Sequence, residues 1–136
     1  MIAIDTNILV YAFDTAYPEK RKVCREILLK AFEGKETIVV TNQILAEFAH
    51  VVTRKIEKPL NKEETRAIVG ALISCAHCNI FDYNSESVLH ALTSANPFWD
   101  ALIAQTLKEN NITELITENT KDFVNAAITV KNPFKS

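Results

Sequence analysis

The sequence predicts an α/β fold, a three-layer α/β/α sandwich with a mainly parallel central sheet. Short apolar or β-branched segments alternate with longer segments in which apolar residues recur at helical spacing. The helical segments are long enough to cross a sheet, so consecutive strands are expected to run parallel. We expect residues 1–136 to form one domain, because a chain of this length suits a single core and shows neither a linker nor a repeat.

The expected strands are short and are bounded by polar or turn-forming residues. The clearest is Thr37-Ile38-Val39-Val40-Thr41, in which every residue is β-branched. The segment before Asp5 is a purely apolar run, which is typical of a strand buried on both faces. The five expected strands cover residues 1–4, 37–41, 80–81, 114–117 and 127–130.

Helices are expected between these strands because start and stop signals flank the periodic segments. Thr6 and Asn7 begin a short helix whose apolar residues extend to Phe13. Pro18 is suited to the first position of a second helix, and Gly34 ends it. Four further helices are expected at about residues 42–55, 61–78 (capped by Asn61, with Glu64 in a capping box), 85–94 and 98–109.

Composition excludes several classes of protein. The chain has 15 basic and 17 acidic residues, and this net charge of −2 argues against a uniformly basic surface for nucleic acid. Its two glycines, Gly34 and Gly70, are too few for a dinucleotide fingerprint or a P-loop. No apolar run reaches the ~18–20 residues of a membrane span, and the start lacks the basic region of a signal peptide. With three cysteines and a sizeable core, the chain is expected to be cytoplasmic and reduced.

Four acids occupy positions where a solvated carboxylate is not expected. Asp5 ends the first strand, Glu47 and Asp100 interrupt the apolar stripes of their helices, and Asp122 follows a late strand. Each acid also has a simpler explanation when it is taken singly. Asp5 could cap a helix, and Asp100 could be stabilised by the helix dipole in a first turn. Glu47 could pair with Arg54, and Asp122 could lie in a turn. Taken together, converging carboxylates favour a hard divalent cation such as Mg²⁺ or Mn²⁺.

Basic residues gather in the first half of the chain, beside the expected acidic crevice. A cluster on each of two segments suggests contact with the phosphates of a substrate, although a solvated helix face is the simpler interpretation. The candidates for substrate binding are Arg21, Lys22, Arg54 and Lys55.

Cysteines, histidine and aromatic residues suggest fewer functions. Cys75-Ala76-His77-Cys78 is one pair where a structural zinc site usually needs two, and it is expected to close a helix rather than open one. Trp99 beside Asp100 could stack on a base, but core packing is the expectation. Other residues expected in the core are Phe32, Phe48, Phe81 and Leu102.

Four motifs in order resemble those of PIN-domain nucleases. They are Ile2-Ala3-Ile4-Asp5-Thr6-Asn7-Ile8-Leu9, the segment from Thr41 to Phe48 that contains Glu47, Phe98-Trp99-Asp100-Ala101-Leu102-Ile103-Ala104, and Leu115 to Phe123. Together they span nearly the whole chain. A bare PIN domain of this length most resembles the toxin of VapBC toxin–antitoxin pairs.

The resemblance implies a metal-dependent endoribonuclease. It implies that Mg²⁺ or Mn²⁺ is held by Asp5, Glu47, Asp100 and Asp122, with Thr6, Asn7 and Thr117 as polar supports. Many members of the family have an acid where this chain has Asn119, so either Asn119 or Asp122 fills the fourth position. The resemblance also implies a small antitoxin whose tail blocks the acidic groove, and a homodimeric toxin.

Other functions remain open on the sequence alone. A PIN-like scaffold that binds RNA without cleaving it and a solitary RNA-processing nuclease share these motifs. A receiver-like signalling domain needs an acid after the central strand, where Val39-Val40-Thr41 has none. A phosphatase with a D-x-D strand needs a second acid where Asp5-Thr6-Asn7 has Asn7.

Overall fold

The computed structural model describes residues 1–135 and has the expected α/β architecture. Five strands in this part of the chain form one sheet in the order β3-β2-β1-β4-β5, and all four neighbouring pairs are parallel. The strands are β1 (Ile2–Ile4), β2 (Ile38–Thr41), β3 (Cys78–Phe81), β4 (Glu114–Ile116) and β5 (Thr129–Lys131).

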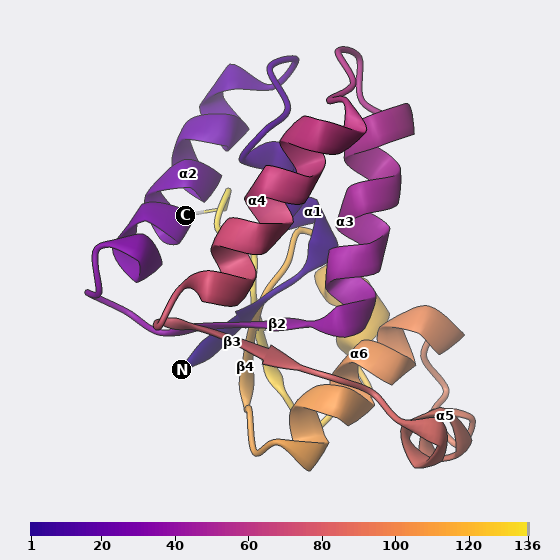
Figure 1. Cartoon of the computed structure of the whole chain (residues 1–136). Coiled ribbons are helices and arrows are strands. Elements are labelled where there is room, and N and C mark those ends of the chain that lie inside the picture. The colour runs from indigo at the N-terminus through magenta and orange to yellow at the C-terminus, as the bar shows by residue number, and fades with distance from the viewer. Residues whose placement is uncertain (136) are drawn as a thin grey trace.

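Helices cover both faces of this sheet. One group lies on one side and the other group on the opposite side (Figure 1), as right-handed crossovers between parallel strands require. The first group contains α1 (Thr6–Tyr11), α2 (Pro18–Phe32), α3 (Asn42–Arg54) and α4 (Lys62–Ser74). The second contains α5 (Ser85–Ala91), α6 (Phe98–Glu109) and the short 3₁₀ helix η1 (Thr120–Phe123).

The three central strands are buried between these layers. Ile38 pairs in register with Ile2, and Leu115 pairs with Ala3, so β1 is flanked by parallel strands on both edges. Helices close the core with fully buried side chains that include Ile8, Phe48, Ile103 and Leu107. Burial on both faces explains why β1 and β2 are continuous apolar runs rather than alternating patterns.

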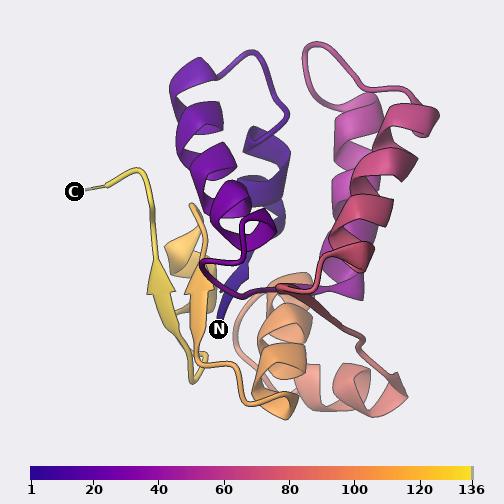
Figure 2. The same ribbon diagram turned by 60° about the vertical axis from the view of Figure 1, so that its left-hand side comes forward.

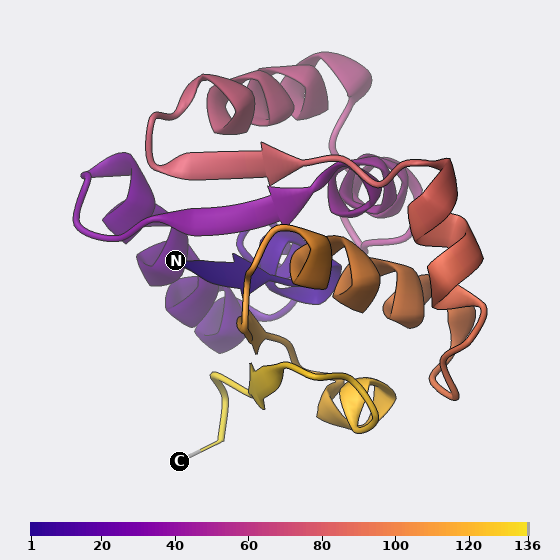
Figure 3. The same ribbon diagram turned by 90° about the horizontal axis from the view of Figure 1, so that it is seen from below.

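The chain changes direction across the sheet at β1. It passes from β1 to β2 and β3 on one side, and it returns to β4 and β5 on the other (Figure 3). In such sheets a crevice opens beyond the carboxyl ends of the strands on either side of the reversal. Asp5 follows β1 and Thr117 follows β4, so the two residues meet at this crevice.

Local signals account for most helix boundaries. Pro18 is the first residue of α2, and Asn61 and Glu64 form a capping box at the start of α4. Gly34 follows α2 with a φ of +75°, a conformation that glycine adopts without strain. Beyond β5 the chain turns back toward α2 (Figure 2), where Phe134 contacts the Tyr11 ring.

Several boundary predictions were wrong. α4 ends at Ser74 rather than near residue 78, because Cys78 already pairs with Ile38 as the first residue of β3. The 3₁₀ helix η1 was not predicted, and β5 begins at Thr129 rather than Ala127.

Two aromatic residues predicted in the core lie at the surface. Phe32 is 47% exposed at the last turn of α2, and Trp99 is 60% exposed in the first turn of α6. Phe32 is the last residue of α2 and Trp99 the second residue of α6, so both lie at helix ends. Within residues 1–135 no helix is both long enough and apolar enough to cross a membrane.

Candidate active site

Asp5 lies at the centre of the crevice and is only 4% exposed. Its extended backbone ends β1 and caps α1, and its carboxylate accepts a 2.7 Å hydrogen bond from the Thr6 amide. The hydroxyl of Thr117 donates a second hydrogen bond of 2.8 Å, and the Asn7 amide donates a third of 3.4 Å. Asp5 is therefore a helix cap and also a side chain fixed from β4.

Glu47 reaches the same crevice from the second turn of α3. Its two carboxylate oxygens accept hydrogen bonds of 2.8 Å, one from the Thr6 hydroxyl and one from the Gln43 amide. The Gln43 amide also donates to the Trp99 carbonyl at 2.9 Å, which ties α3 to the first turn of α6. Gln43 therefore connects the helix of Glu47 to the helix of Asp100.

Asp100 enters the crevice from the opposite helical layer. It lies in the first turn of α6, behind Pro97 at the N-cap position. Burial raises the pKa of Asp100 to about 6, and the charges of Asp5, Asp122 and Glu47 add to this shift. A carboxyl group so destabilised as an anion is a good candidate to accept a cation.

Asp122 and Asn119 come from the segment that follows β4. Asp122 lies in η1 and does not line the groove, although its charge raises the pKa of both Asp5 and Asp100. Asn119 does line the groove, and its backbone amide donates a 3.1 Å hydrogen bond to the Thr117 hydroxyl. Asn119 is thus at the groove surface, with Asp122 behind it but within electrostatic range.

The four acids repel one another in this arrangement. Burial raises the pKa of Asp5, against the lowering effect of its hydrogen bonds from Thr117 and Thr6, and the charges of Glu47 and Asp122 raise it further. No cationic side chain is among the causes that shift Asp5 or Asp100. The crevice accordingly concentrates negative charge without a counterion from the described side chains.

Hard oxygen donors of this kind suit a divalent cation such as Mg²⁺ or Mn²⁺. In residues 1–135, however, no three acidic, histidine or cysteine side chains stand close enough together to form a ready-made metal site. Hydrogen bonds from Thr6, Gln43 and Thr117 hold the Glu47 and Asp5 carboxylates in their present positions. The donor set fits the ion in chemistry, because the carboxylates of Asp5, Glu47 and Asp100 all line one groove.

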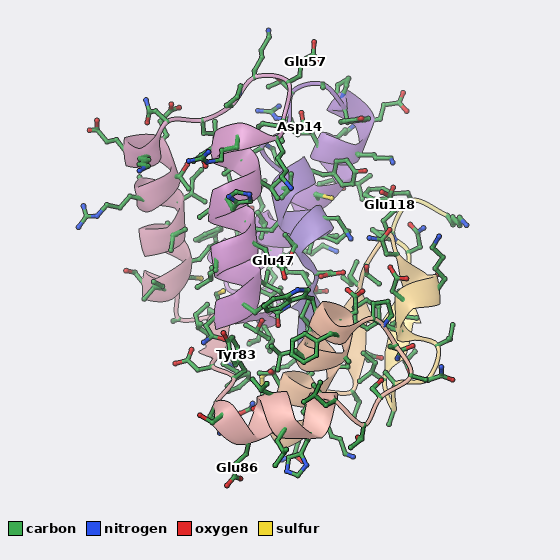
Figure 4. All side chains as sticks on the ribbon, turned by 90° about the vertical axis from the view of Figure 1, so that its right-hand side faces the viewer. Asp14, Glu47, Glu57, Tyr83, Glu86 and Glu118 are labelled. Atoms are coloured by element: carbon green, nitrogen blue, oxygen red, sulfur yellow. The ribbon has the colours of Figure 1, made fainter. Side chains whose placement is uncertain are left out.

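A groove of about 640 Å³ leads away from the acids. It runs from Asp5, Glu47 and Asp100 to the loops that follow α1 and α3, where Asp14 and Glu57 lie (Figure 4). Of the four basic candidates only Lys55 lines it; Arg21, Lys22 and Arg54 do not. The Thr6 and Asn7 side chains lie at the acidic end, where Thr6 donates to Glu47 and Asn7 donates to Asp5.

Sequence reasoning missed several groove residues. Gln43 precedes Glu47 by one helical turn, a spacing at which side chains meet, so it could have been found. Tyr11 and Tyr17 carry no motif signal. Lys20, which precedes the candidates Arg21 and Lys22, pairs with Glu118 and lies 4.8 Å from the centre of the Tyr11 ring.

The cysteine and histidine segment lies apart from the groove. It links α4 to β3 rather than closing a helix, with Cys75 at the helix end and Cys78 in the strand. All three cysteines are free thiols, and burial raises the pKa of Cys24 and of Cys78 to about 12. High pKa values make these two thiols poor nucleophiles.

Solved structures of three proteins share this fold over most of their length. VapBC2 from Rickettsia felis, solved bound to a promoter DNA fragment, has 22% identity and a TM-score of 0.64, covering 97% of this chain and 98% of that one. FitAcB from Neisseria gonorrhoeae has 18% identity and a TM-score of 0.66, covering all of both chains. VapC20 from Mycobacterium tuberculosis, a sarcin–ricin loop cleaving toxin, has 9% identity and a TM-score of 0.66, covering 94% and 98%.

No protein with a curated description matches the chain. The PIN domain family model, in contrast, matches residues 2–128, which include all four acids and both loops of the groove. With this match over nearly the whole chain, the protein belongs to the PIN domain family.

Proposed function

We propose that this protein is an endoribonuclease that hydrolyses RNA phosphodiester bonds with the help of Mg²⁺ or Mn²⁺. The observation that carries the proposal is the convergence of Asp5, Glu47 and Asp100 on one groove, with Asp122 within electrostatic range. Membership of a nuclease family agrees with this chemistry.

Asp5, Glu47 and Asp100 would hold the cation, and Asp122 would assist through its charge or through a water. When bound, a divalent ion supplies an activated water and positive charge against the phosphorane-like transition state. Thr117 and Thr6 fix the orientation of Asp5, and Gln43 fixes that of Glu47. Lys55 lies along the groove, where it would contact a phosphate of the bound strand.

Metal dependence tests the proposal directly. Purified protein is expected to cleave a defined RNA in Mg²⁺ or Mn²⁺ and to stop in EDTA. Asp5→Asn and Asp100→Asn should each lose at least a hundredfold in rate. Glu86→Gln is the matched control, because Glu86 lies in the first turn of α5 as Asp100 does in α6, but outside the groove (Figure 4).

We also propose that the protein is the toxin of a toxin–antitoxin pair, with a small antitoxin as its partner and a homodimeric assembly. The shared fold supports this, since VapC20 is a sarcin–ricin loop cleaving toxin, VapBC2 was solved on a fragment of its promoter DNA, and FitAB was solved on the IR36 DNA fragment. Coexpression with the short reading frame upstream should protect cells from growth arrest. A genome without such a frame would favour a solitary, cytoplasmic RNA-processing nuclease.

One observation supports a second candidate, a PIN-like scaffold that binds RNA without cleaving it. The described acids do not form a ready-made metal site, and the neutral Asn119 stands at the groove where the family resemblance implies an acid. A scaffold would bind RNA equally in EDTA and in Mg²⁺ and would leave it intact. The titration with metal therefore separates the two candidates.

A further inference from the structure

The half of the groove away from the acids has no role in holding a metal ion. The groove as a whole has a volume of about 640 Å³, which falls within the ~300–1,000 Å³ of pockets that hold small organic ligands. This far half lies between the α1–α2 loop and the end of α3. Its lining includes Val10, Tyr11, Asp14, Tyr17, Val51 and Ile56.

Tyr17 presents an aromatic ring to this half of the groove and is 50% exposed. The ring packs edge-to-face on Tyr11 at 5.5 Å and an angle of 76°. Tyr11 is fixed in turn by a 2.7 Å hydrogen bond to Glu118 and by an edge contact with Phe134. Lys20 lies 5.8 Å from the centre of the Tyr17 ring. An exposed ring held by such neighbours is a preorganised surface for stacking.

Asp14 adds a hydrogen-bond acceptor beside this ring. It is only 5% exposed yet lines the groove. One of its oxygens accepts a 3.1 Å hydrogen bond from the Ala16 amide, and no donor within residues 1–135 pairs with the other. That second oxygen is not among the fully buried unpaired atoms of the described residues, so it is accessible from the groove and can accept a hydrogen bond from a ligand N–H.

The charge of this half determines which part of RNA fits there. Asp14, Glu57 and Lys55 line it, so this half carries one net negative charge. That charge favours a neutral base over a phosphate beside Asp14, and Lys55 at the end of α3 is left to contact a neighbouring phosphate. An apolar floor from Val51 and Ile56 suits the face of a base, and the Asp14 oxygen suits an exocyclic amino group.

We propose that this half of the groove is a nucleobase subsite for the nucleoside next to the scissile phosphate. Tyr17 stacks on the base, and Asp14 accepts a hydrogen bond from its amino group, which favours guanine, adenine or cytosine over uracil. The proposal rests on the proposed RNA-cleaving function, since the acids of the same groove set the position of the scissile phosphate.

The test uses short RNAs with one cleaved bond, in which each flanking nucleoside is replaced in turn by an abasic ribose. Tyr17→Ala should raise KM about tenfold on intact RNA, in keeping with the ~1–3 kcal/mol of base stacking, and Tyr17→Phe should not. At one abasic position the Tyr17→Ala penalty should vanish. Phe32→Ala is the matched control, because Phe32 is similarly exposed but lies outside the groove.

Asp14→Asn tests the polar part of the subsite. The position to vary is the one at which an abasic ribose removes the Tyr17→Ala penalty. Wild-type protein should show a higher KM for RNA with uracil there than for RNA with cytosine. In Asp14→Asn the difference between these two KM values should be severalfold smaller. An equal Tyr17→Ala penalty on intact and abasic RNA would overturn the proposal. So would base preference unchanged by Asp14→Asn, or a Tyr17→Ala defect confined to antitoxin binding.

Failure of cleavage is a separate outcome. If wild-type protein cuts no RNA in Mg²⁺ or Mn²⁺, the proposed function is wrong, and the subsite is then tested by fluorescence anisotropy with the same RNAs. Weaker binding of intact but not of abasic RNA by Tyr17→Ala supports the subsite. Equal binding of both RNAs by the variant and by wild type contradicts it.

Discussion

The hydroxyl of Thr117 donates a 2.8 Å hydrogen bond to the carboxylate of Asp5 across 112 residues of sequence. β1 and β4 are neighbours in the sheet, and each residue directly follows its strand. The contact therefore joins the two sides of the crevice at the point where strand order reverses. It also lowers the pKa of Asp5, in opposition to the effect of burial.

Thr117→Val is expected to weaken the active site without unfolding the protein. Loss of the hydroxyl removes a donor to the buried Asp5 carboxylate, so the pKa of Asp5 should rise further. The metal concentration that gives half-maximal cleavage should then increase about tenfold. Thr117→Ser, which keeps the hydroxyl, should remain close to wild type. Unchanged metal dependence in the valine variant would show that this hydrogen bond does not prepare Asp5.

Gln43→Ala is expected to lower both stability and activity. The side chain donates to Glu47 and to the Trp99 carbonyl, and loss of such partners costs roughly 1–3 kcal/mol. The melting temperature should fall by several degrees. Because Glu47 loses its orientation, kcat should fall by a larger factor than KM rises. Gln105→Ala serves as control, since Gln105 makes the same i,i+4 contact with Glu109 on an exposed face. Equal losses in the two variants would argue against a positioning role.

Asp100 should make metal-free protein more stable at mildly acid pH. Its folded pKa of about 6 lies above the ordinary value of 3.8, so the folded chain binds this proton more tightly than the unfolded chain. The ionised Asp100 carboxylate therefore destabilises the folded protein fully above pH 6. This destabilisation disappears as pH falls through 6 toward 4. Melting temperature in EDTA should thus rise from pH 7 to pH 5, and the rise should be smaller in Asp100→Asn.

Metal reverses this relationship, because the cation needs the deprotonated carboxyl group. In saturating Mg²⁺ the wild-type protein should gain stability toward pH 7, and Asp100→Asn should gain little. Identical pH profiles for the two proteins in EDTA would contradict the assigned environment of Asp100.

Lys55 is expected to contribute to RNA binding more than the other basic candidates. It is the one among Arg21, Lys22, Arg54 and Lys55 that lines the groove. Lys55→Met should weaken binding severalfold and reduce the slope of log affinity against log salt by about one, as loss of one phosphate contact does. Lys22→Met is the control, and an equal effect from it would place the RNA elsewhere.

The sequence was sufficient to predict the layers and the parallel sheet, because apolar strands alternate with capped helices. It also pointed to Asp5, Glu47 and Asp100, since carboxylates at a strand end or on a buried helix stripe have no other obvious partner. Chain order alone could not show that α4 stops before Cys75, because the strand pairing of Cys78 with Ile38 ends the helix. Tertiary pairing overrides helix periodicity at such a boundary.

Side-chain partnerships were less predictable than backbone elements. Lys20 belongs to a basic run, but its contact with Glu118 joins residues 98 positions apart in the sequence. Trp99 follows a helical apolar pattern, yet it lies in the first turn of α6 with most of its side chain exposed. Tyr17 and the buried Asp14 lie in the α1–α2 loop. A loop has no regular periodicity from which the side chains that face a groove could be predicted.

The central claim is tested most directly by calorimetric titration with Mn²⁺, paired with cleavage of one defined RNA. The proteins compared are wild type, Asp5→Asn and Glu86→Gln. We expect wild type and Glu86→Gln to bind Mn²⁺ and cut the RNA, and Asp5→Asn to lose both properties while melting as a folded protein. Metal binding and RNA cleavage retained in Asp5→Asn would contradict the assignment of this groove as a metal-dependent nuclease site.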